Sequence, residues 1–433
     1  MIGVNVFLLS VLKMLKVSST NTLLRNGMLF SLFSFINRGF IFLLLLILAN
    51  YIAPAEYGYL SLFSTVLMVI GYFICLSSEG YMSVSYFREG EQHLKSTFST
   101  IFFLGVSITL LLLVIISIGG QSLANILDLP QHILFIAVFI SFFTAMANVN
   151  LDYFRLKEKV KIYGLFSCSN AFLNFVLSIF LVKYCLLSWQ GRVYAQIGCT
   201  ALFGIYAIWF FQRRKLITFD FKHKLLPMLA WSIPIIPLHA TNFLRQGLDR
   251  YIINYYHSID DVGLFSFAMN IANIITMIGF GFNQSNSVEI YKILGDHNLT
   301  KLQKRQSLSK QKTTMFFVYL ISTILITISC YFIIPLILPK YSYSMKYFLI
   351  LSLYGFFVCV YLMFTNFLYF YKKTKLIMYA SVGSSLLHLL LSLLLTQYSL
   401  FLTCFIYSLS QGLFAFLVMF YANRTLRSTI GES

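Results

Sequence analysis

The chain has 433 residues, of which 59% are hydrophobic and only 11% are charged, and its mean hydropathy is +0.80. Soluble domains carry about 25% charged residues. A soluble domain of this length could not bury so much apolar surface in its core. The net charge of +18 does not indicate nucleic-acid binding, because the basic residues lie in short segments between apolar runs. The composition therefore predicts an all-α integral membrane protein.

Apolar stretches follow one another along the whole chain, each close to the length of about 20 residues that a membrane-spanning helix needs. The connections between them are short, and the longest are two basic segments near 212–228 and 289–312. The sequence predicts twelve transmembrane helices, near residues 28–50, 59–79, 98–119, 131–151, 162–183, 192–211, 232–257, 262–288, 313–336, 346–370, 377–396 and 399–421.

Lysine and arginine residues alternate between the two sides of the predicted membrane. The termini and the even-numbered connections hold 25 of the 32 basic residues, whereas the odd-numbered connections hold 4. Because cytoplasmic loops carry the excess of Lys and Arg in membrane proteins, both termini are predicted to be cytoplasmic. The alternation also supports an even number of spans, since one missed span would disrupt it.

A short pattern recurs at an offset of 205 residues. The segment Glu56-Tyr57-Gly58-Tyr59-Leu60-Ser61 follows the first span, and Asp261-Val262-Gly263-Leu264-Phe265-Ser266 follows the seventh. Both copies are predicted in a short periplasmic turn entering the next span, which favours two parallel repeats with substrate bound between them. The predicted organisation begins with a cytoplasmic lead-in (1–27) and a six-helix bundle (28–211). A basic cytoplasmic linker (212–228) joins this bundle to a second six-helix bundle (229–422), which is followed by a cytoplasmic tail (423–433).

Three arginines, Arg38, Arg245 and Arg250, lie inside predicted spans. An intramembrane Arg costs about 2.5–3.5 kcal/mol on insertion scales, so it indicates a wet cavity or a bonded partner. Arg38 shares a helix face with Ser31 and Ser34, at spacings of i, i+3 and i+7. Two interpretations of Arg38 remain open. It is either a cation that lines a cavity or a residue that pairs with a neighbouring span during assembly.

The seventh span carries a polar stripe. Asn242, Arg245, Gln246 and Asp249 follow the spacing i, i+3, i+4, i+7, and Arg250 flanks them. Such a stripe lines water or a polar interface, although Arg245 and Asp249 are also spaced to form a structural ion pair. Prolines at 234 and 237 predict either a bend that lets the span rock or a simple helix start.

The remaining polar residues near membrane depth give weaker signals. Glu79 is the candidate for ion coupling, because no cation lies within one turn of it. Amides of the eighth span, including Asn270 and Asn273, suit either hydroxyl-rich ligands or contacts between helices. His239 and His388 are isolated in the sequence, so they receive no metal or catalytic role.

No enzyme or nucleotide-binding motif is recognisable, because the chain has no P-loop, GxSxG or HExxH pattern. We therefore expect no enzyme activity and no cofactor. Energy for transport would come from a proton or sodium gradient, from the membrane potential or from the substrate gradient itself.

Several segments carry a family resemblance over almost the whole chain. They are Asn37-Arg38, the stretch Asn50-Tyr51-Ile52-Ala53-Pro54-Ala55-Glu56-Tyr57-Gly58, and Leu248-Asp249-Arg250-Tyr251-Ile252. With the predicted span count, they resemble the polysaccharide-transport branch of the multidrug/oligosaccharidyl-lipid/polysaccharide (MOP) exporter superfamily, specifically bacterial O-antigen flippases. Lipid II flippases of the same superfamily usually have two further C-terminal spans, which this chain is not expected to have.

The resemblance implies two six-helix bundles around a V-shaped cavity that opens alternately to each side of the bacterial inner membrane. The implied substrate is an undecaprenyl-pyrophosphate-linked oligosaccharide, moved to the periplasmic leaflet, with membrane lipids and other O-antigen assembly proteins as partners. The implied pyrophosphate-binding cations are Arg38, Arg245 and Arg250. The expected polar residues of the cavity are Asn37, Asn242, Gln246, Asp249, Asn270 and Asn273.

Two other functions remain as alternatives. A multidrug or metabolite antiporter could use the same fold, but an exporter of cations would need acidic residues in a cavity that is predicted to be positive. A membrane enzyme such as an O-antigen polymerase would be expected to carry a large periplasmic loop, whereas the predicted periplasmic connections are short.

Overall fold

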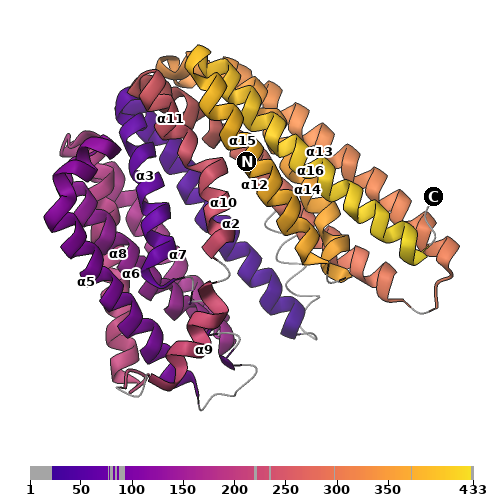
Figure 1. Ribbon diagram of the computed structural model, residues 1–433, viewed down its shortest axis with the longest axis horizontal. Helices are drawn as coiled ribbons and strands as arrows, with labels where there is room; N and C mark the ends of the chain where they lie inside the picture. The colour runs from indigo at the N-terminus through magenta and orange to yellow at the C-terminus, as the bar shows by residue number, and fades with distance from the viewer. Residues whose placement is uncertain are drawn as a thin grey trace, which may run out of the picture. The chain divides into compact units, whose positions relative to one another are not determined.

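The fold is known from a computed structural model, which describes residues 22–430 apart from 77, 79–80, 83–84, 87–92, 219–221, 234–235, 297 and 372. Every regular element in these ranges is helical (Figure 1). Ten of the described helices are long and apolar enough to cross a membrane. The predicted all-α membrane fold is therefore confirmed.

The described helices group into two compact units. Unit 1 comprises the chain up to Ile52 and Val69–Ile236. Aromatic packing holds it together, since the ring centroids of Phe98 and Phe211 lie 3.7 Å apart. Its helices are α2 (Thr22–Tyr51), α5 (Leu94–Leu127), α6 (Gln131–Leu156), α7 (Val160–Ile179) with the π-turn η4 (Phe180–Tyr184), α8 (Ser188–Arg213) and α9 (Lys222–Ser232).

Unit 2 comprises Ala53–Met68 and Pro237–Ser433. Helix α3 (Pro54–Ile74) therefore begins in unit 2 and ends in unit 1. The core of unit 2 is fully buried around side chains such as Tyr319, Phe367 and Val418. Its other helices are α10 (Ile236–Gln246), α11 (Leu248–Tyr256), α12 (Ile259–Gly295), α13 (Lys301–Ile337), η6 (Pro339–Ser344), α14 (Met345–Phe370), α15 (Thr374–Leu395), η7 (Thr396–Tyr398) and α16 (Leu400–Ile430).

Some predicted boundaries differ from the structure. The basic linker predicted at 212–228 is helical in its second half, because α9 begins at Lys222. The connection predicted at 289–312 is mostly helix, and α13 begins directly after Thr300, whose side chain and Gln303 form a capping box. The division between the units, after Ile236, lies inside the C-terminal bundle predicted at 229–422.

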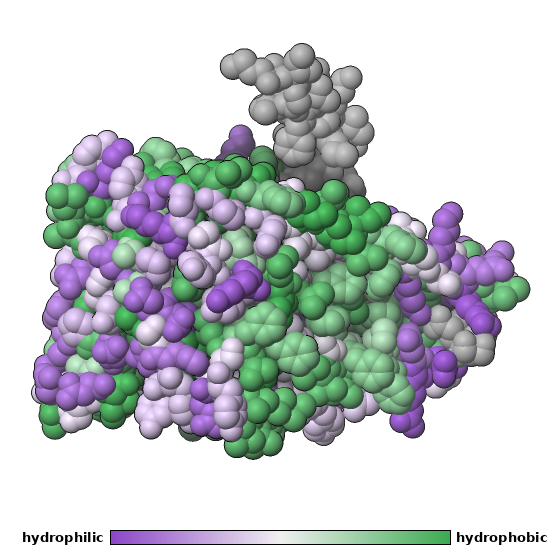
Figure 2. Space-filling model, turned by 90° about the horizontal axis from the view of Figure 1, so that it is seen from above, coloured by the Kyte–Doolittle hydropathy of each residue, from purple (hydrophilic) through white to green (hydrophobic). Residues whose placement is uncertain are grey.

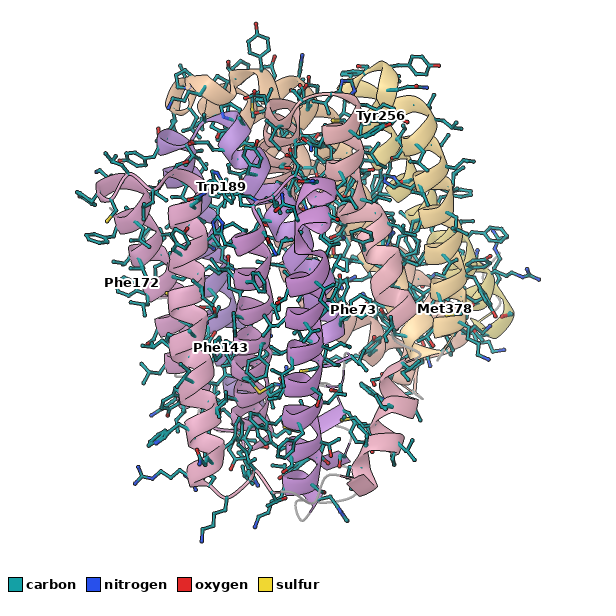
Figure 3. The ribbon with its side chains drawn as sticks, turned by 60° about the vertical axis from the view of Figure 1, so that its left-hand side comes forward. Phe73, Phe143, Phe172, Trp189, Tyr256 and Met378 are labelled. Atoms are coloured by element: carbon teal, nitrogen blue, oxygen red, sulfur yellow. The ribbon has the colours of Figure 1, made fainter. Side chains whose placement is uncertain are left out.

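Large apolar side chains are exposed along the long helices, as expected where lipid is the solvent. Ile118 in α5 is 85% exposed and Leu336 in α13 is 82% exposed. Figure 2 shows a broad hydrophobic area on the face in view. Figure 3 shows Phe172 of α7 pointing outward from its helix, where it is 55% exposed.

The acidic residues of the repeat lie in the first turns of α3 and α12, where they take part in hydrogen bonds at the helix N-terminus. In the first copy, the carboxylate of Glu56 accepts a hydrogen bond of 2.7 Å from the backbone N–H of Ala53. In the second, Ser258 caps α12 by accepting from the backbone N–H of Asp261, and its hydroxyl donates to the Asp261 carboxylate. The acids therefore serve to start α3 and α12, and the glycines and serines that follow lie inside the helices rather than in a turn.

The glycines and serines of the repeat form a crossing between α3 and α12 within unit 2. Ser61 and Ser266, which are 205 residues apart, share a hydrogen bond of 2.5 Å. A Cβ atom on Gly58 would collide with the carbonyl oxygen of Ile259, and one on Gly263 would collide with that of Pro54. Pro54 and Ile259 are also 205 residues apart, so they occupy equivalent positions in the two copies. The glycine of each copy therefore packs against the same position of the other copy.

Candidate functional site

The predicted seventh span is broken in the middle. Helix α10 ends at Gln246, Gly247 forms a turn, and α11 begins at Leu248. A side chain at Gly247 would collide with Thr65 and Met68 of α3. Glycine therefore permits α3 to approach the break closely. The break separates Arg245 on one side from Asp249 on the other, so the predicted stripe is not one continuous helix face.

Arg245 points into the interior of unit 2. Its two terminal nitrogens donate to Gln411 of α16 at 3.5 Å and to Ser381 of α15 at 3.4 Å. Its guanidinium carbon lies 4.7 Å from the ring centre of Phe414. Its Nε–H is buried without a hydrogen-bond acceptor. All of these contacts are with neutral groups, so the positive charge has no carboxylate partner among the described residues.

Arg250 is held in a similar way on the other side of the break. Its Nη1 donates to the hydroxyl of Thr65 in α3 at 2.9 Å, and its Nε–H is buried without an acceptor. No described carboxylate forms an ion pair with it. Two guanidinium groups with spare donors thus flank the break at Gly247, which is the arrangement that an anionic ligand needs.

Asp249 does not pair with Arg245, although their spacing permits it. Its carboxylate faces His388 of α15, with His388 Nε2 at 2.9 and 3.1 Å from its two oxygens, and it accepts a bond of 2.9 Å from Ser392. Asp249 is 1% exposed and His388 is 0% exposed. The interpretation of His388 as isolated was therefore wrong. The partner lies 139 residues away in the chain, beyond the reach of any sequence spacing.

The amides of α12 mostly bond to other helices. Asn270 donates to the hydroxyl of Tyr57 in α3 at 2.7 Å. Asn283 accepts from Asn366 at 2.8 Å, and Asn286 accepts from Gln311 at 3.0 Å. These contacts join α12 to α3, α14 and α13. They favour the interpretation of the amides as contacts between helices.

The other predicted site residues are less informative. Gln246 is exposed at the end of α10, and Asn273 is half-buried in α12. The side chains of Arg38 and Asn242 and the whole of Glu79 lie outside the described residues. Their assignment to a cavity or to ion coupling stays a prediction.

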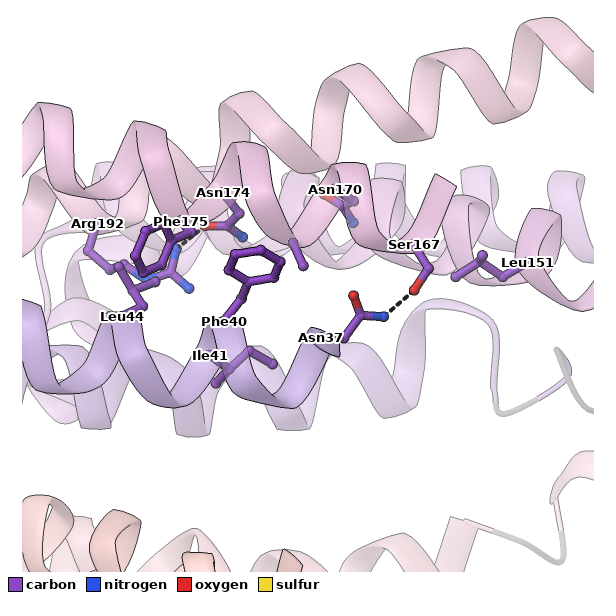
Figure 4. Close-up of a pocket in the computed structure, with 11 residues that line it drawn as sticks. Asn37, Phe40, Ile41, Leu44, Leu151, Ser167, Asn170, Asn174, Phe175 and Arg192 are labelled. Atoms are coloured by element: carbon purple, nitrogen blue, oxygen red, sulfur yellow. Dashed lines mark hydrogen bonds between the residues drawn. The ribbon is translucent and has the colours of Figure 1, made fainter. Parts of the chain in front are cut away.

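Unit 1 contains a pocket of about 230 Å³ lined by residues of α2, α6, α7 and α8, among them three asparagines and Arg192 (Figure 4). Asn37 donates to Ser167 on one side of it, and Arg192 donates to Asn174 at 2.6 Å and to Ser178 at 3.2 Å on the other. Arg192 is the first residue of the span predicted at 192–211, and α8 begins one turn before it. Figure 4 shows its side chain beside Asn174.

We expect Asn174→Ala to destabilise unit 1, because Arg192 would keep only the longer bond to Ser178. A hydrogen bond to a charged group contributes about 1.5–3 kcal/mol, so the midpoint of thermal unfolding in detergent should fall measurably. Asn125→Ala is the matched control, since the exposed Asn125 amide bonds only weakly to Gln121 at 3.4 Å. Equal unfolding midpoints for the two variants would contradict the role given to Asn174.

The family of the chain follows from its sequence relatives. The family model described as polysaccharide biosynthesis protein matches residues 23–288, and the model named MatE matches residues 234–394. An Lsg locus protein of Haemophilus influenzae is 27% identical over 357 residues, covering 80% of this chain and 84% of that protein. An uncharacterized membrane protein of the same organism is 24% identical over 356 residues with the same coverage.

Solved structures show the same fold at low sequence identity. The lipid II flippase MurJ, in an inward closed conformation, has a TM-score of 0.70 and 16% identity, covering 91% of this chain and 87% of MurJ. A multidrug resistance MATE family transporter of the MOP superfamily, in an inward-facing conformation, has a TM-score of 0.68 and 12% identity, covering 90% of this chain and 95% of the transporter. The chain thus belongs to the polysaccharide biosynthesis protein family and has the fold of the MOP superfamily.

Proposed function

We propose that the protein is a flippase that moves undecaprenyl-pyrophosphate-linked oligosaccharides, the repeat units of O-antigen, from the cytoplasmic to the periplasmic leaflet of the inner membrane by alternating access. The observation that carries this proposal is the pair of arginines beside Gly247. Arg245 and Arg250 donate only to neutral oxygens, and the one acidic residue between them is bonded to His388 instead. Family membership supports transport of a polysaccharide precursor rather than an enzyme reaction.

The chemistry of the substrate explains why arginines are needed. A pyrophosphate that leaves water must exchange its hydration shell for donors, and guanidinium groups bind phosphate oxygens through two parallel hydrogen bonds. Arg245 and Arg250 have unused Nε–H donors for this purpose. Arg38 completes the proposed set of cations. The amide-rich pocket of unit 1 offers donors and acceptors of the kind that sugar hydroxyls require.

The alternative, a multidrug or metabolite antiporter on the same fold, has weaker support in unit 2. A cationic drug would need a free carboxylate to balance its charge. Asp249 lies two residues after Gly247 in the chain, and both of its oxygens already accept hydrogen bonds. Unchanged drug sensitivity in a deletion strain would exclude this alternative, whereas hypersensitivity would favour it.

The test of the flippase proposal is deletion of the gene, followed by mapping of lipid-linked repeat units between the two leaflets. We expect these units to accumulate in the cytoplasmic leaflet and surface polymer to disappear, with recovery on complementation. Accessibility to a membrane-impermeant oxidant of sugar diols, added to intact spheroplasts and to inverted vesicles, reports the leaflet. An unchanged distribution between leaflets in the deletion strain would overturn the proposal.

A further inference from the structure

The Asp249–His388 pair of unit 2 has a geometry that the proposed substrate does not explain. Both oxygens of Asp249 lie within 3.1 Å of His388 Nε2, and His388 Nδ1 lies 3.0 Å from the hydroxyl of Ser410 in α16. Ser392 donates to the carboxylate from the next turn of α15. All four side chains are at most 3% exposed. A titratable pair is thus enclosed by side chains that hydrogen-bond to every one of its polar atoms.

Each polar atom of this network has a hydrogen-bond partner whether His388 is neutral or protonated. Apart from the added proton, the two states differ only in the direction of the Ser410 hydroxyl hydrogen. With neutral His388, Nε2–H donates to Asp249, and Ser410 can turn its hydrogen towards Nδ1. With protonated His388, Nδ1–H donates to Ser410, and the Ser410 hydroxyl donates instead to the carbonyl oxygen of Tyr407 at 3.0 Å. Buried polar groups are costly when unpaired, so a site that pairs them in both states can exchange a proton without a large rearrangement.

Further buried hydroxyl groups lie between this pair and the end of the helices. Ser392 follows His388 by four residues on the same face of α15, and Thr396 follows Ser392 by four residues at the start of η7. Thr403 of α16 donates to the Thr396 hydroxyl at 3.1 Å, and His257 Nε2 lies 2.6 Å from the Thr396 carbonyl oxygen. His388 and Asp249 are each seven residues from the end of their helix, which corresponds to about 10 Å from the predicted periplasmic end.

The titratable and charged groups around the pair come from each helix packed on it. Arg250 follows Asp249 in α11 and interacts with it electrostatically. Cys404 and Tyr407 of α16 also interact with Asp249, and the Tyr407 ring lies edge-on to His388 with 5.6 Å between centroids. Tyr354 of α14 packs against Tyr407 at 4.8 Å. None of these neighbours is a second acid, so the carboxylate–imidazole pair is the proton acceptor of this region within the described residues.

We propose that the Asp249–His388 pair binds the proton that drives transport, which it receives from the predicted periplasmic side. The proton reaches Nδ1 of neutral His388 from the side of Ser410 and forms an N–H bond there, which leaves an imidazolium whose Nε2–H donates to the Asp249 carboxylate. On release this N–H bond breaks, and the proton returns to water on the opposite side.

Proton binding changes the net charge of the pair from negative to neutral. The proton is added on α15, but the carboxylate that it neutralises belongs to α11, across Gly247 from Arg245 and next to Arg250 in the chain. Protonation thus weakens the negative field on the two arginines and strengthens their attraction for a phosphate. This link to the substrate rests on the proposed function, whereas the proton site itself does not.

The test measures proton binding by the full-length protein, reconstituted without substrate into phosphatidylethanolamine–phosphatidylglycerol vesicles on a solid-supported membrane. A jump from neutral to mildly acidic pH should displace charge in the wild-type protein. His388→Gln and Asp249→Asn should reduce this displacement to the level of protein-free vesicles. His132→Gln is the matched control, because His132 is an exposed histidine at the start of α6, and it should respond like the wild type.

Ser410→Ala is the milder variant for the case in which the first two fail to fold, as judged by gel filtration. When His388 is protonated, this change removes the acceptor of the charge-assisted bond from Nδ1–H. When His388 is neutral, it removes only the weaker bond between the Ser410 hydroxyl and Nδ1. We therefore expect the midpoint of the charge displacement to move to lower pH by about 0.5–1 unit. An unchanged midpoint, or a wild-type displacement in folded His388→Gln, would overturn the inference.

The failure of this inference is distinguishable from failure of the proposed function. If deletion leaves the lipid-linked units normally distributed but the charge displacement depends on His388, the proton site stands and the substrate is another one. If deletion traps the units in the cytoplasmic leaflet but His388→Gln displaces charge like the wild type, the flippase stands and the proton site is wrong.

Discussion

Replacing Arg245 with alanine is expected to abolish surface polysaccharide while the protein remains in the membrane at its normal level. The guanidinium of Arg245 contacts only Ser381, Gln411 and the ring of Phe414, so its removal leaves no buried charge unpaired among the described residues. A bound pyrophosphate, in contrast, would lose two charged hydrogen bonds of about 1.5–3 kcal/mol each, which corresponds to a loss of transport of about a hundredfold or more. Arg245→Lys should restore part of the activity, because lysine keeps the charge but lacks the planar fork.

The matched control for this prediction is Arg155→Ala. Arg155 lies near the end of α6, its side chain is 55% exposed, and it pairs with Asp152 on the same helix. Exposed pairs of this kind contribute about 0–1 kcal/mol, so the variant should export normally. Surface polymer is measured by gel electrophoresis and leaflet distribution by oxidant accessibility. Normal export in Arg245→Ala and Arg250→Ala alike, at normal protein levels, would refute the phosphate-binding role of the two arginines.

The sequence was a good guide to the helices because each one is dominated by apolar side chains in a single solvent, lipid. The predicted span at 131–151 and the observed α6 (Gln131–Leu156) begin at the same residue, for example. Hydropathy did not predict the ends of helices that extend beyond the apolar region, because charged residues in water are compatible with a helix. Helix α13, which begins at Lys301, is an example. It also failed at Gly247, because one glycine inside an apolar pattern does not reveal the close approach of α3.

The candidate site was predictable only in part. The polar residues of the seventh span were visible in its pattern, but their partners were not, because these lie on other helices far along the chain. His388 illustrates the difficulty. The serines that share its face of α15 (Ser381, Ser385 and Ser392) and the threonine that follows them (Thr396) are visible as a stripe in the sequence, yet only the fold places Asp249 opposite them. A buried stripe of hydroxyl groups was the signal that could have led to the histidine.

Replacing Gly263 with leucine is expected to be the most destabilising single change at the α3–α12 crossing. The Cβ atom of any side chain at Gly263 would overlap the carbonyl oxygen of Pro54, and a backbone atom has no rotamer with which to move away. Small residues let membrane helices approach closely, and the Ser61–Ser266 hydrogen bond depends on that approach. Overpacking typically costs about 1–3 kcal/mol, and a clash with backbone should reach or exceed the upper end.

The repeat adds a sharper form of this prediction, because Gly58 and Gly263 exchange roles across the crossing. Gly58→Leu should lower the midpoint of thermal unfolding in detergent by a similar amount, and the double variant should fall less than the two single effects added, since either change alone already separates the helices. Gly71→Leu in α3 and Gly281→Leu in α12 are matched controls, because a Cβ atom at either position meets nothing within 4 Å. Unfolding midpoints that do not distinguish Gly263→Leu from Gly281→Leu would show that the crossing tolerates separation, and strictly additive effects at Gly58 and Gly263 would show that the two copies pack independently.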